Sequence, residues 1–292
     1  MKLLIVGTGA LATLFGATLS KSGVKITMLG TWKEGINALS ERGAELDGEA
    51  FPVNATSNPK DCSGSTHAIV LVKSWQTERV AHQLQSCLTP EGVAITLQNG
   101  LGNDMVLANT LGEDRVTIGV TTIAARMMGP GKVKSGGEGL VTLKDEPRVA
   151  GLVSIFQKSG IPVNLVNDIK PIQWMKLAIN AAINPLTALL QVPNGELLNL
   201  PSAKLLMDAL AREVGRVAEA LGVSIPTPGP EGIVEDVTSR TAINLSSMLQ
   251  DVMRGNFTEI DAINGGVIKA AQKTGIPVPI NQAIWQLVKN LK

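Results

Sequence analysis

Three polar residues stand out on an otherwise apolar segment. Lys176, Asn180 and Asn184 are spaced i, i+4 and i+8, and every position between them is Leu, Ala or Ile. This spacing places the three on one narrow stripe of a helix, whereas a solvent-facing stripe is normally wider and richer in charge. One cation and two amides on such a stripe predict a buried helix that lines a polar cavity. The alternative is a core Asn pair satisfied by backbone groups, with Lys176 at the surface.

A second chemical signal is a glycine turn near the N-terminus. Gly7-Thr8-Gly9-Ala10-Leu11-Ala12 follows an apolar run, opens a helical pattern and matches the dinucleotide fingerprint G-x-G-x-x-A. In this motif the first glycine permits the tight turn, the second lets the backbone approach a pyrophosphate, and the small last residue lets helix and strand pack closely. The helix N-terminus offers N–H groups to the phosphates. The alternative is an ordinary tight turn.

The end of the second predicted strand bears on which dinucleotide binds. NAD-binding versions usually carry an acid there for the ribose 2′-hydroxyl, but Leu29-Gly30-Thr31-Trp32-Lys33 has none before Glu34. NADP is therefore favoured, with Thr31 and Lys33 as ligands of the 2′-phosphate. The alternative is that Lys33 only begins a solvated helix.

Polar residues also end two further predicted strands. Lys73 follows Val70-Leu71-Val72, and Gln98-Asn99-Gly100 follows the next apolar run. Parallel sheets bind ligands at the carboxyl ends of their strands, so Lys73 and Asn99 are candidate cofactor contacts. The alternatives are a lysine that extends to solvent and a simple Asn-Gly turn.

The C-terminal half offers a further polar set. Asn244, Ser247 and Asp251 fall at i, i+3 and i+7 of a predicted helix, and Glu259 begins the next one. Glu259 is either a favourable first-turn acid or the partner of a buried lysine, and spacing alone does not decide between them.

Composition excludes several chemistries. The 292 residues contain no Tyr, two His and two Cys, so no tyrosine hydroxyl can act as an acid. Cys62 and Cys87 lie outside any CxxC or HExxH pattern, which argues against a zinc site. A disulfide between them is an alternative, but two Cys in a chain of this size are more typical of cytosolic thiols. The net charge of +1 provides no polycationic field for nucleic acid or an anionic membrane.

The uncharged stretch from Leu3 to Ser20 resembles a signal peptide or membrane span in composition only. Gly7, Gly9 and Gly16 interrupt it and no cleavage pattern follows, so a buried strand and a turn are predicted instead. We expect a cytoplasmic protein.

The elements that must position these residues change type along the chain. Strand-like runs at residues 2–6, 24–29, 68–72, 93–97 and 116–122 alternate with helical stretches, and Gly129-Pro130-Gly131 predicts a hairpin through residues 133–144. Helical periodicity then dominates at residues 172–190, 203–221, 233–253, 258–274 and 282–289. The pattern predicts an α/β Rossmann-type dinucleotide-binding domain over residues 1–167, followed by an all-α domain over residues 168–292.

At its polar helices the chain resembles the ketopantoate reductase (2-dehydropantoate 2-reductase) family, over nearly its full length. The resemblance is carried by four segments: Lys176-Leu-Ala-Ile-Asn180-Ala-Ala-Ile-Asn184-Pro185-Leu-Thr187-Ala188, Pro193-Asn194-Gly195-Glu196, Ser246-Ser247-Met248-Leu249-Gln250-Asp251 and Thr258-Glu259-Ile260-Asp261-Ala-Ile-Asn264-Gly265.

The resemblance implies NADPH-dependent reduction of the 2-ketone of ketopantoate to pantoate, on the route to pantothenate and coenzyme A. By matching position, Lys176 is implied as the catalytic lysine and Glu259 as its carboxylate partner, which also lies at the cofactor. The implied substrate contacts are Asn180, Asn184, Asn194, Asn244 and Ser247. The implied cofactor contacts are Gly7, Thr8, Gly9, Ala10, Leu11, Ala12, Thr31, Lys73 and Asn99.

Two departures from the family bear on these expectations. The family often has Arg where Thr31 stands, which weakens the expected NADP preference, and Ala12 replaces the usual Gly. The expected chemistry is hydride transfer to C2 of a small 2-oxo acid, with Lys176 as general acid. The alternatives are a reductase of another branched 2-oxo acid and a non-catalytic NADP-binding regulator, as a monomer or homodimer.

Overall fold

The structure, a computed structural model, describes residues 1–291 and consists of two compact units. The first contains Met1–Gln98 and Asn103–Ile169, and the second contains Asn99–Gly102 and the chain from Lys170 onward. We predicted a division between residues 167 and 168, whereas the compact units divide between Ile169 and Lys170. The short segment Asn99–Gly102 groups with the second unit, which no periodicity indicated.

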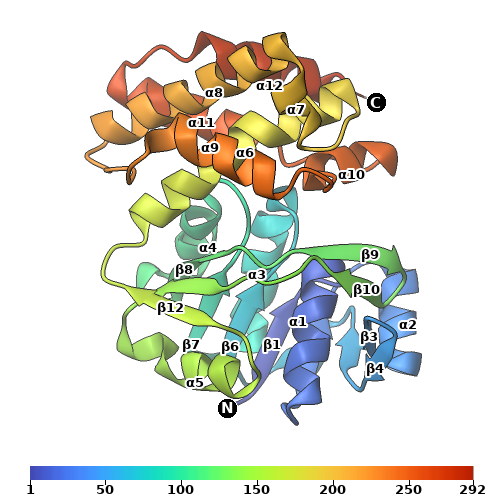
Figure 1. Cartoon of the computed structure of the whole chain (residues 1–292). Helices are drawn as coiled ribbons and strands as arrows, with labels where there is room; N and C mark the ends of the chain where they lie inside the picture. Colours follow the sequence, from blue (N-terminus) through green and yellow to red (C-terminus); the bar gives the residue numbers. More distant parts are fainter. Residues whose placement is uncertain (292) are drawn as a thin grey trace. The chain divides into compact units, whose positions relative to one another are not determined.

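The first unit is built on an eight-stranded sheet (Figure 1). In spatial order its strands are β12 (Val163–Val166), β11 (Val141–Lys144), β8 (Val116–Thr121), β7 (Leu88–Thr96), β6 (Ser65–Val70), β1 (Leu3–Val6), β2 (Ile26–Leu29) and β5 (Asn54–Thr56). All neighbouring pairs are parallel except β11 with β8. The helices of this unit are α1 (Ala10–Lys21), α2 (Lys33–Arg42), α3 (Thr77–Cys87), α4 (Asn103–Leu111) and α5 (Ala150–Lys158).

The strand order places a switch point beside β1. The chain moves from β1 to β2 on one side and later returns to pair β6 on the other side, with Val6 aligned to both Leu29 and Val70. Ligands of open α/β sheets bind outside the carboxyl ends of strands at such a point. This is the Rossmann-type arrangement that the sequence predicts.

Apolar side chains cover both faces of this sheet. β1 alternates between them, since Leu3 and Ile5 join one buried cluster while Leu4 and Val6 join another. Phe15 of α1 and Phe156 of α5 are fully buried, with ring centroids 5.7 Å apart. The sheet is therefore buried on both sides, as mostly parallel sheets require.

The predicted hairpin through residues 133–144 is only partly formed. β9 (Ala125–Gly129) and β10 (Lys132–Ser135) pair antiparallel in a small second sheet with β3 (Ala44–Leu46) and β4 (Glu49–Phe51). Residues 141–144 instead form β11 of the main sheet. Three glycines at 136, 137 and 139 separate the two strands, and Gly137 has a φ of +104°, so the chain leaves the hairpin there.

The described residues of the second unit form helices and connecting loops, and no strand. Its helices are α6 (Lys170–Leu190), α7 (Glu196–Asn199), α8 (Pro201–Ala220), α9 (Gly229–Arg240), α10 (Ser247–Met253), α11 (Asn264–Thr274) and α12 (Pro279–Lys289). Figure 1 shows how these helices are arranged. Their apolar side chains form a core of their own, with α6 and α8 packed against each other. None of the helices in residues 1–291 combines the length and apolarity needed to cross a membrane.

Two predicted helices were too long. The segment 233–253 is divided into α9 and α10, because Ser246 caps α10 by accepting the N–H of Leu249 at 3.0 Å. The segment 258–274 becomes helical only at Asn264. Residues 260–263 form a turn, in which the N–H groups of Ala262 and Ile263 donate to the carbonyl of Glu259. Ile263 has a ψ of −90°, outside the helical range, so the helix starts after it. Asn244 therefore lies in a loop and Glu259 in a turn.

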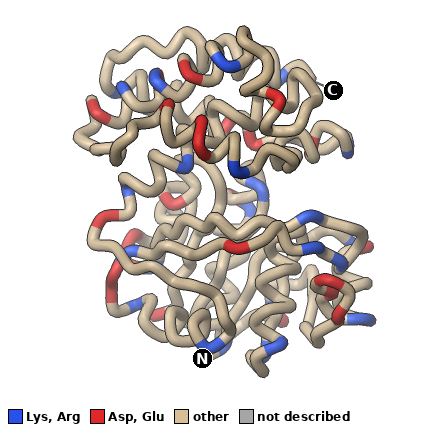
Figure 2. The backbone as a smooth tube through the Cα atoms, in the orientation of Figure 1, with Lys and Arg blue, Asp and Glu red and all other residues tan. Residues whose placement is uncertain are grey.

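Charged residues of both signs are interspersed along each unit (Figure 2). The two cysteines, Cys62 and Cys87, are free and buried.

Candidate functional site

The glycine turn is built by a close approach of two backbone segments. Gly7 follows β1 with a φ of +134°, and a Cβ there would lie 3.1 Å from the carbonyl oxygen of Leu71 and 3.3 Å from Cβ of Ala12. A side chain would be strained at this φ, which favours glycine. Small Ala12, itself fully buried, therefore matches the close helix–strand packing.

The second glycine leaves open space over the start of α1. A Cβ built on Gly9 would meet nothing within 4 Å, no side chain caps this helix end, and its first turn contains no acid. The N–H groups of the first turn and the helix dipole are thus available to an anion. These residues fit the phosphates of a dinucleotide.

The residues beside this turn have different surroundings. Thr8 is buried and its side chain fills the space above Gly30, where a Cβ would lie 2.5 Å from Cγ2 of Thr8. Thr31 follows β2 and is exposed. Trp32, also partly exposed, lays its ring against Gly35, where a Cβ would lie 2.3 Å from Cε3 of Trp32. Sequence reasoning did not assign a role to this aromatic ring beside Thr31.

Lys73 and Gln98 lie at the carboxyl ends of β6 and β7. Lys73 is half-buried and precedes a short 3₁₀ turn. The Gln98 amide donates to the carbonyl of Val72 at 2.9 Å and to the hydroxyl of Thr77 at 2.9 Å. Gln98 thereby ties together the two strand ends, a role that its position in the sequence did not reveal.

In the second unit, α6 carries the predicted polar stripe. Lys176 and Asn180 are half-buried, and Asn184 is 7% exposed. Burial lowers the pKa of Lys176 to about 8, although the negative charge of Glu259 acts in the opposite direction. Within the described chain, the carboxamides of Asn180 and Asn184 form no hydrogen bond. The alternative of an exposed Lys176 and a backbone-satisfied Asn pair is therefore wrong.

Glu259 is 6% exposed and lies in the turn before α11. The Asn99 amide donates to its Oε2 at 3.4 Å, and the N–H of Leu101 donates to the carbonyl of Ala262 at 2.9 Å. Gly100, with a φ of +85°, lies so close that a Cβ would be 2.3 Å from this carbonyl oxygen. Asn99–Gly102 is thus held against the turn that carries Glu259, a contact that sequence reasoning missed.

The other predicted substrate contacts come from loops and a helix start. Asn194 is 8% exposed; its amide donates to the hydroxyl of Thr241 at 2.9 Å, and its N–H to the carbonyl of Asn244 at 3.0 Å. Asn194 therefore supports the loop, while Asn244 and Ser247 are exposed. The hydroxyl that fixes α10 belongs to Ser246, which is bonded to Thr187 of α6 at 2.7 Å.

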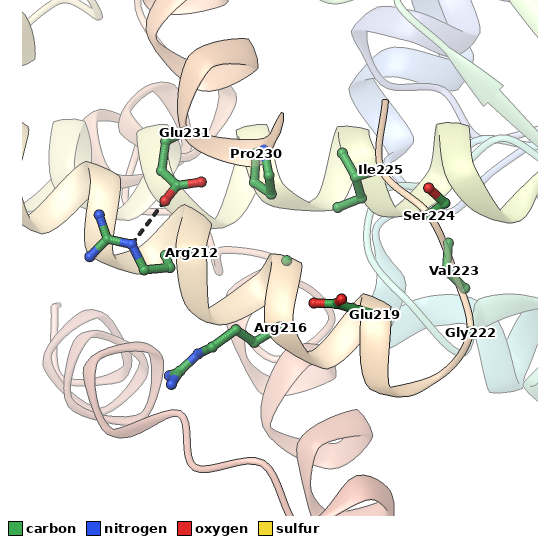
Figure 3. A pocket seen from close by; sticks show the side chains of 10 residues that line it. Arg212, Arg216, Glu219, Gly222, Val223, Ser224, Ile225, Pro230 and Glu231 are labelled. Carbon is green, nitrogen blue, oxygen red and sulfur yellow. Dashed lines mark hydrogen bonds and ion pairs between the residues drawn. The ribbon is translucent and has the colours of Figure 1, made fainter. Parts of the chain in front are cut away.

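A surface pocket of about 580 Å³ lies elsewhere on the second unit (Figure 3). Arg212, Arg216, Glu219 and Glu231 provide its charges, and Arg212 is paired with Glu231 at 2.8 Å. None of the predicted site residues lines it. Within residues 1–291, no cluster of His, Cys, Asp and Glu side chains is arranged to hold a metal ion.

The second unit therefore presents a lysine whose pKa is lowered to about 8 by burial, a buried carboxylate whose charge acts on it, and two amides with free hydrogen-bonding capacity. A buried ammonium can stabilise an oxyanion and transfer a proton. Separately, the first unit presents an uncapped helix N-terminus beside a glycine turn, with open space for an anion.

Comparison with known proteins agrees with this chemistry. Residues 3–147 match the family described as "Ketopantoate reductase PanE/ApbA", and residues 168–292 match "Ketopantoate reductase PanE/ApbA C terminal". The chain belongs to the ketopantoate reductase family. It is thus a member of an oxidoreductase family, and the fold and resemblance predicted from the sequence are confirmed.

Relatives of this family match the chain from end to end. A 2-dehydropantoate 2-reductase of Archaeoglobus fulgidus is 34% identical over 295 residues, covering 99% of this chain and 97% of the relative. A 2-dehydropantoate 2-reductase of Halobacterium salinarum is 32% identical over 303 residues, covering 99% of this chain and 98% of the relative.

Solved structures of similar proteins have the same fold. A PanE/ApbA family ketopantoate reductase from Ralstonia eutropha superposes with a TM-score of 0.93 at 30% identity, covering 100% of this chain and 98% of that one. A D-mandelate dehydrogenase, solved with NADH and anilino(oxo)acetate, has a TM-score of 0.90 at 25% identity, and the match covers 99% of this chain and 97% of that one.

Proposed function

We propose that this protein reduces the 2-ketone of 2-dehydropantoate to pantoate, with NADPH as the reductant. The observation that carries the proposal is Lys176, a half-buried lysine with a pKa of about 8 that is acted on by the charge of Glu259. It lies one helical turn from an amide without a partner, Asn180. Full-length similarity to 2-dehydropantoate 2-reductases supports the choice of substrate.

The dinucleotide would be held by the first unit, through Gly7, Gly9 and the start of α1, with Thr31 and Lys73 as further contacts. When bound, it supplies the hydride. NADPH rather than NADH is proposed because no acid ends β2, so nothing there binds a 2′-hydroxyl or repels a 2′-phosphate.

The protein's own groups carry the proton chemistry. The Lys176 ammonium stabilises negative charge as it develops on the ketone oxygen and donates the proton that completes the alcohol. Glu259 favours the charged lysine and so keeps the acid protonated near pH 7. The oxo acid would be held by the side chains of Asn180, Asn184, Asn244 and Ser247. The backbone N–H of Asn194 donates to the carbonyl of Asn244 and so supports the loop that carries it.

In this role the protein acts on a small 2-oxo acid in the cytoplasm, on the route to pantothenate and coenzyme A, as a monomer or homodimer. The likeness to D-mandelate dehydrogenase favours one second candidate, a reductase of another 2-oxo acid that uses NADH.

The test is oxidation of NADPH and NADH by the purified protein with ketopantoate and with a panel of branched and aromatic 2-oxo acids. The highest kcat/KM is expected for ketopantoate with NADPH. A higher value for another acid, or for NADH, selects the second candidate. Cofactor binding without turnover of any acid identifies a non-catalytic regulator.

A further inference from the structure

Helix α6 contains a proline in its buried part. Pro185 has no N–H, so the carbonyl of Ala181, four residues earlier, lacks its intrahelical hydrogen-bond donor. Ala181 and Pro185 are both buried, so water does not readily replace that donor. A buried carbonyl without a partner is costly.

The missing donor comes from another helix. The Nδ2 amide of Asn264, the first residue of α11, donates to the Ala181 carbonyl at 3.0 Å. Asn264 is fully buried. Its amide therefore occupies the position that the absent N–H of residue 185 leaves open.

A chain of buried groups fixes the orientation of that amide. Asn264 Nδ2 also donates to Oδ1 of Asn281 at 2.9 Å. Asn281 in turn donates to the Glu213 carboxylate at 2.8 Å and to the Leu210 carbonyl at 3.3 Å. Because Nδ2 of Asn281 is already used for these bonds, its oxygen faces Asn264, and the nitrogen of Asn264 must face α6.

The two ends of this bond adjoin the two charged groups of the site. Ala181 directly follows Asn180, on the helix that carries Lys176, and Asn264 directly follows the turn that begins at Glu259. We propose that Asn264 is a positioning residue that uses the carbonyl freed by Pro185 to hold the Glu259 turn in register with the Lys176 helix. The inference rests on the proposed function for its consequence in catalysis, but the positioning itself is measurable without turnover.

The direct test is an NMR titration of Lys176 in protein labelled with ¹³C-lysine. The Lys176 signal is identified as the one that is missing from the spectrum of the Lys176→Arg variant. In the wild type the midpoint is expected near pH 8. In Asn264→Ala it should fall by about half a pH unit or more, because the charge of Glu259 no longer acts as strongly on the lysine. A midpoint that stays or rises overturns the proposal.

The second variant separates positioning from stability. Pro185→Ala with Asn264→Ala restores an N–H to the Ala181 carbonyl within α6 but not the link to α11. Its unfolding midpoint should recover toward the wild type while the Lys176 titration stays shifted. If the titration recovers with stability, Asn264 is merely structural. Should Asn264→Ala alone fail to fold, the double variant carries the titration measurement.

Val217→Ala serves as a matched control, since Val217 is fully buried in α8 and lies outside this hydrogen-bond chain. It should lower the unfolding midpoint and leave the Lys176 titration in place; a comparable shift in this control also overturns the proposal. With ketopantoate, Asn264→Ala should lower kcat roughly 10- to 100-fold with a smaller change in KM. A shifted titration in a protein that turns over no ketopantoate supports the positioning role and refutes the proposed function.

Discussion

At the scale of single residues, the chemistry depends on how one lysine is surrounded. Lys176 shares its helix with Leu, Ala and Ile, and removal from water disfavours its charged form. Glu259 partly offsets this effect. The balance leaves a group that can hold and release a proton near physiological pH, which an exposed lysine does poorly.

Replacing Lys176 by Ala should lower kcat by roughly 10²- to 10⁴-fold, the usual contribution of a positioned acid. The dissociation constant of NADPH should change little, because the phosphate contacts belong to the first unit. Steady-state kinetics and fluorescence titration measure the two quantities. Lys269→Ala, an exposed lysine on α11, is the control. Near-normal turnover in Lys176→Ala would contradict its role as the acid.

The pH dependence follows from the same lysine. Its pKa of about 8 means that the ammonium is present below that pH and lost above it. The kcat/KM for reduction should therefore fall above pH 8, while the kcat/KM for alcohol oxidation, which needs the neutral amine, should rise over the same range.

Glu259→Gln should shift the fall in the reduction rate to lower pH, because it removes the charge that raises the lysine pKa. Rate profiles in both directions test the assignment, and a reduction rate that does not fall above pH 8 would rule it out.

At the scale of elements, the turn between β1 and α1 places two glycines in opposite situations. Gly7 has a left-handed φ and a backbone neighbour at its Cβ position, whereas Gly9 has an ordinary φ of −82° and open space. Gly7 is therefore required by the fold, whereas we propose that Gly9 serves the ligand.

Gly9→Ala should therefore leave the unfolding midpoint unchanged and weaken NADPH binding at least about tenfold, since the added methyl group occupies the approach of the pyrophosphate. Gly7→Ala should lower the unfolding midpoint itself. Thermal unfolding and cofactor titration of both variants make the comparison. Tight NADPH binding by Gly9→Ala would show that the phosphates bind elsewhere.

We propose that the end of β2 sets the cofactor preference. Thr31 can donate one hydroxyl bond and Lys33 a point charge, but neither offers the bidentate grip of an arginine. NADPH should be preferred over NADH by a modest margin. Thr31→Arg should widen this margin, and Thr31→Asp should reverse it by supplying an acceptor for the 2′-hydroxyl. The ratio of kcat/KM with the two cofactors is decisive, and a wild type that favours NADH would refute the assignment.

At the scale of the whole molecule, the candidate binding residues are divided between two units with separate cores. The glycine turn belongs to the α/β unit, whereas Lys176, Glu259 and the amides belong to the helical unit. Asn99 follows β7 in the sequence but contacts the helical unit.

Amide hydrogen exchange should register this division. NADP⁺ alone should slow exchange chiefly over residues 3–21, and pantoate added to that complex should slow it over residues 176–187 and 244–251, because bound ligands suppress local opening. Mass spectrometry of peptides from both regions measures this. Protection by NADP⁺ confined to the helical unit would contradict the proposed cofactor site.

Features that depend only on the spacing of nearby residues could be predicted from the sequence alone. The glycine turn, the alternation of strands and helices, and the stripe of Lys176, Asn180 and Asn184 all follow from periods of two, 3.6 or four residues and from backbone preferences. Such patterns need no distant partner to be recognised, so the fold class and α6 were predicted correctly.

Tertiary structure decided which distant residues meet. Periodicity carries no information about the bond from Asn264 to Ala181, the link between Asn99 and Glu259, or the pairing of β11 with β8. The same limit explains the helix boundaries that were missed at Asn244 and Glu259, where a capping hydroxyl and a backbone turn override helical spacing. Long-range hydrogen bonds form only once the chain has packed, and in this protein they hold the helix of Lys176, the turn of Glu259 and the loops beside them.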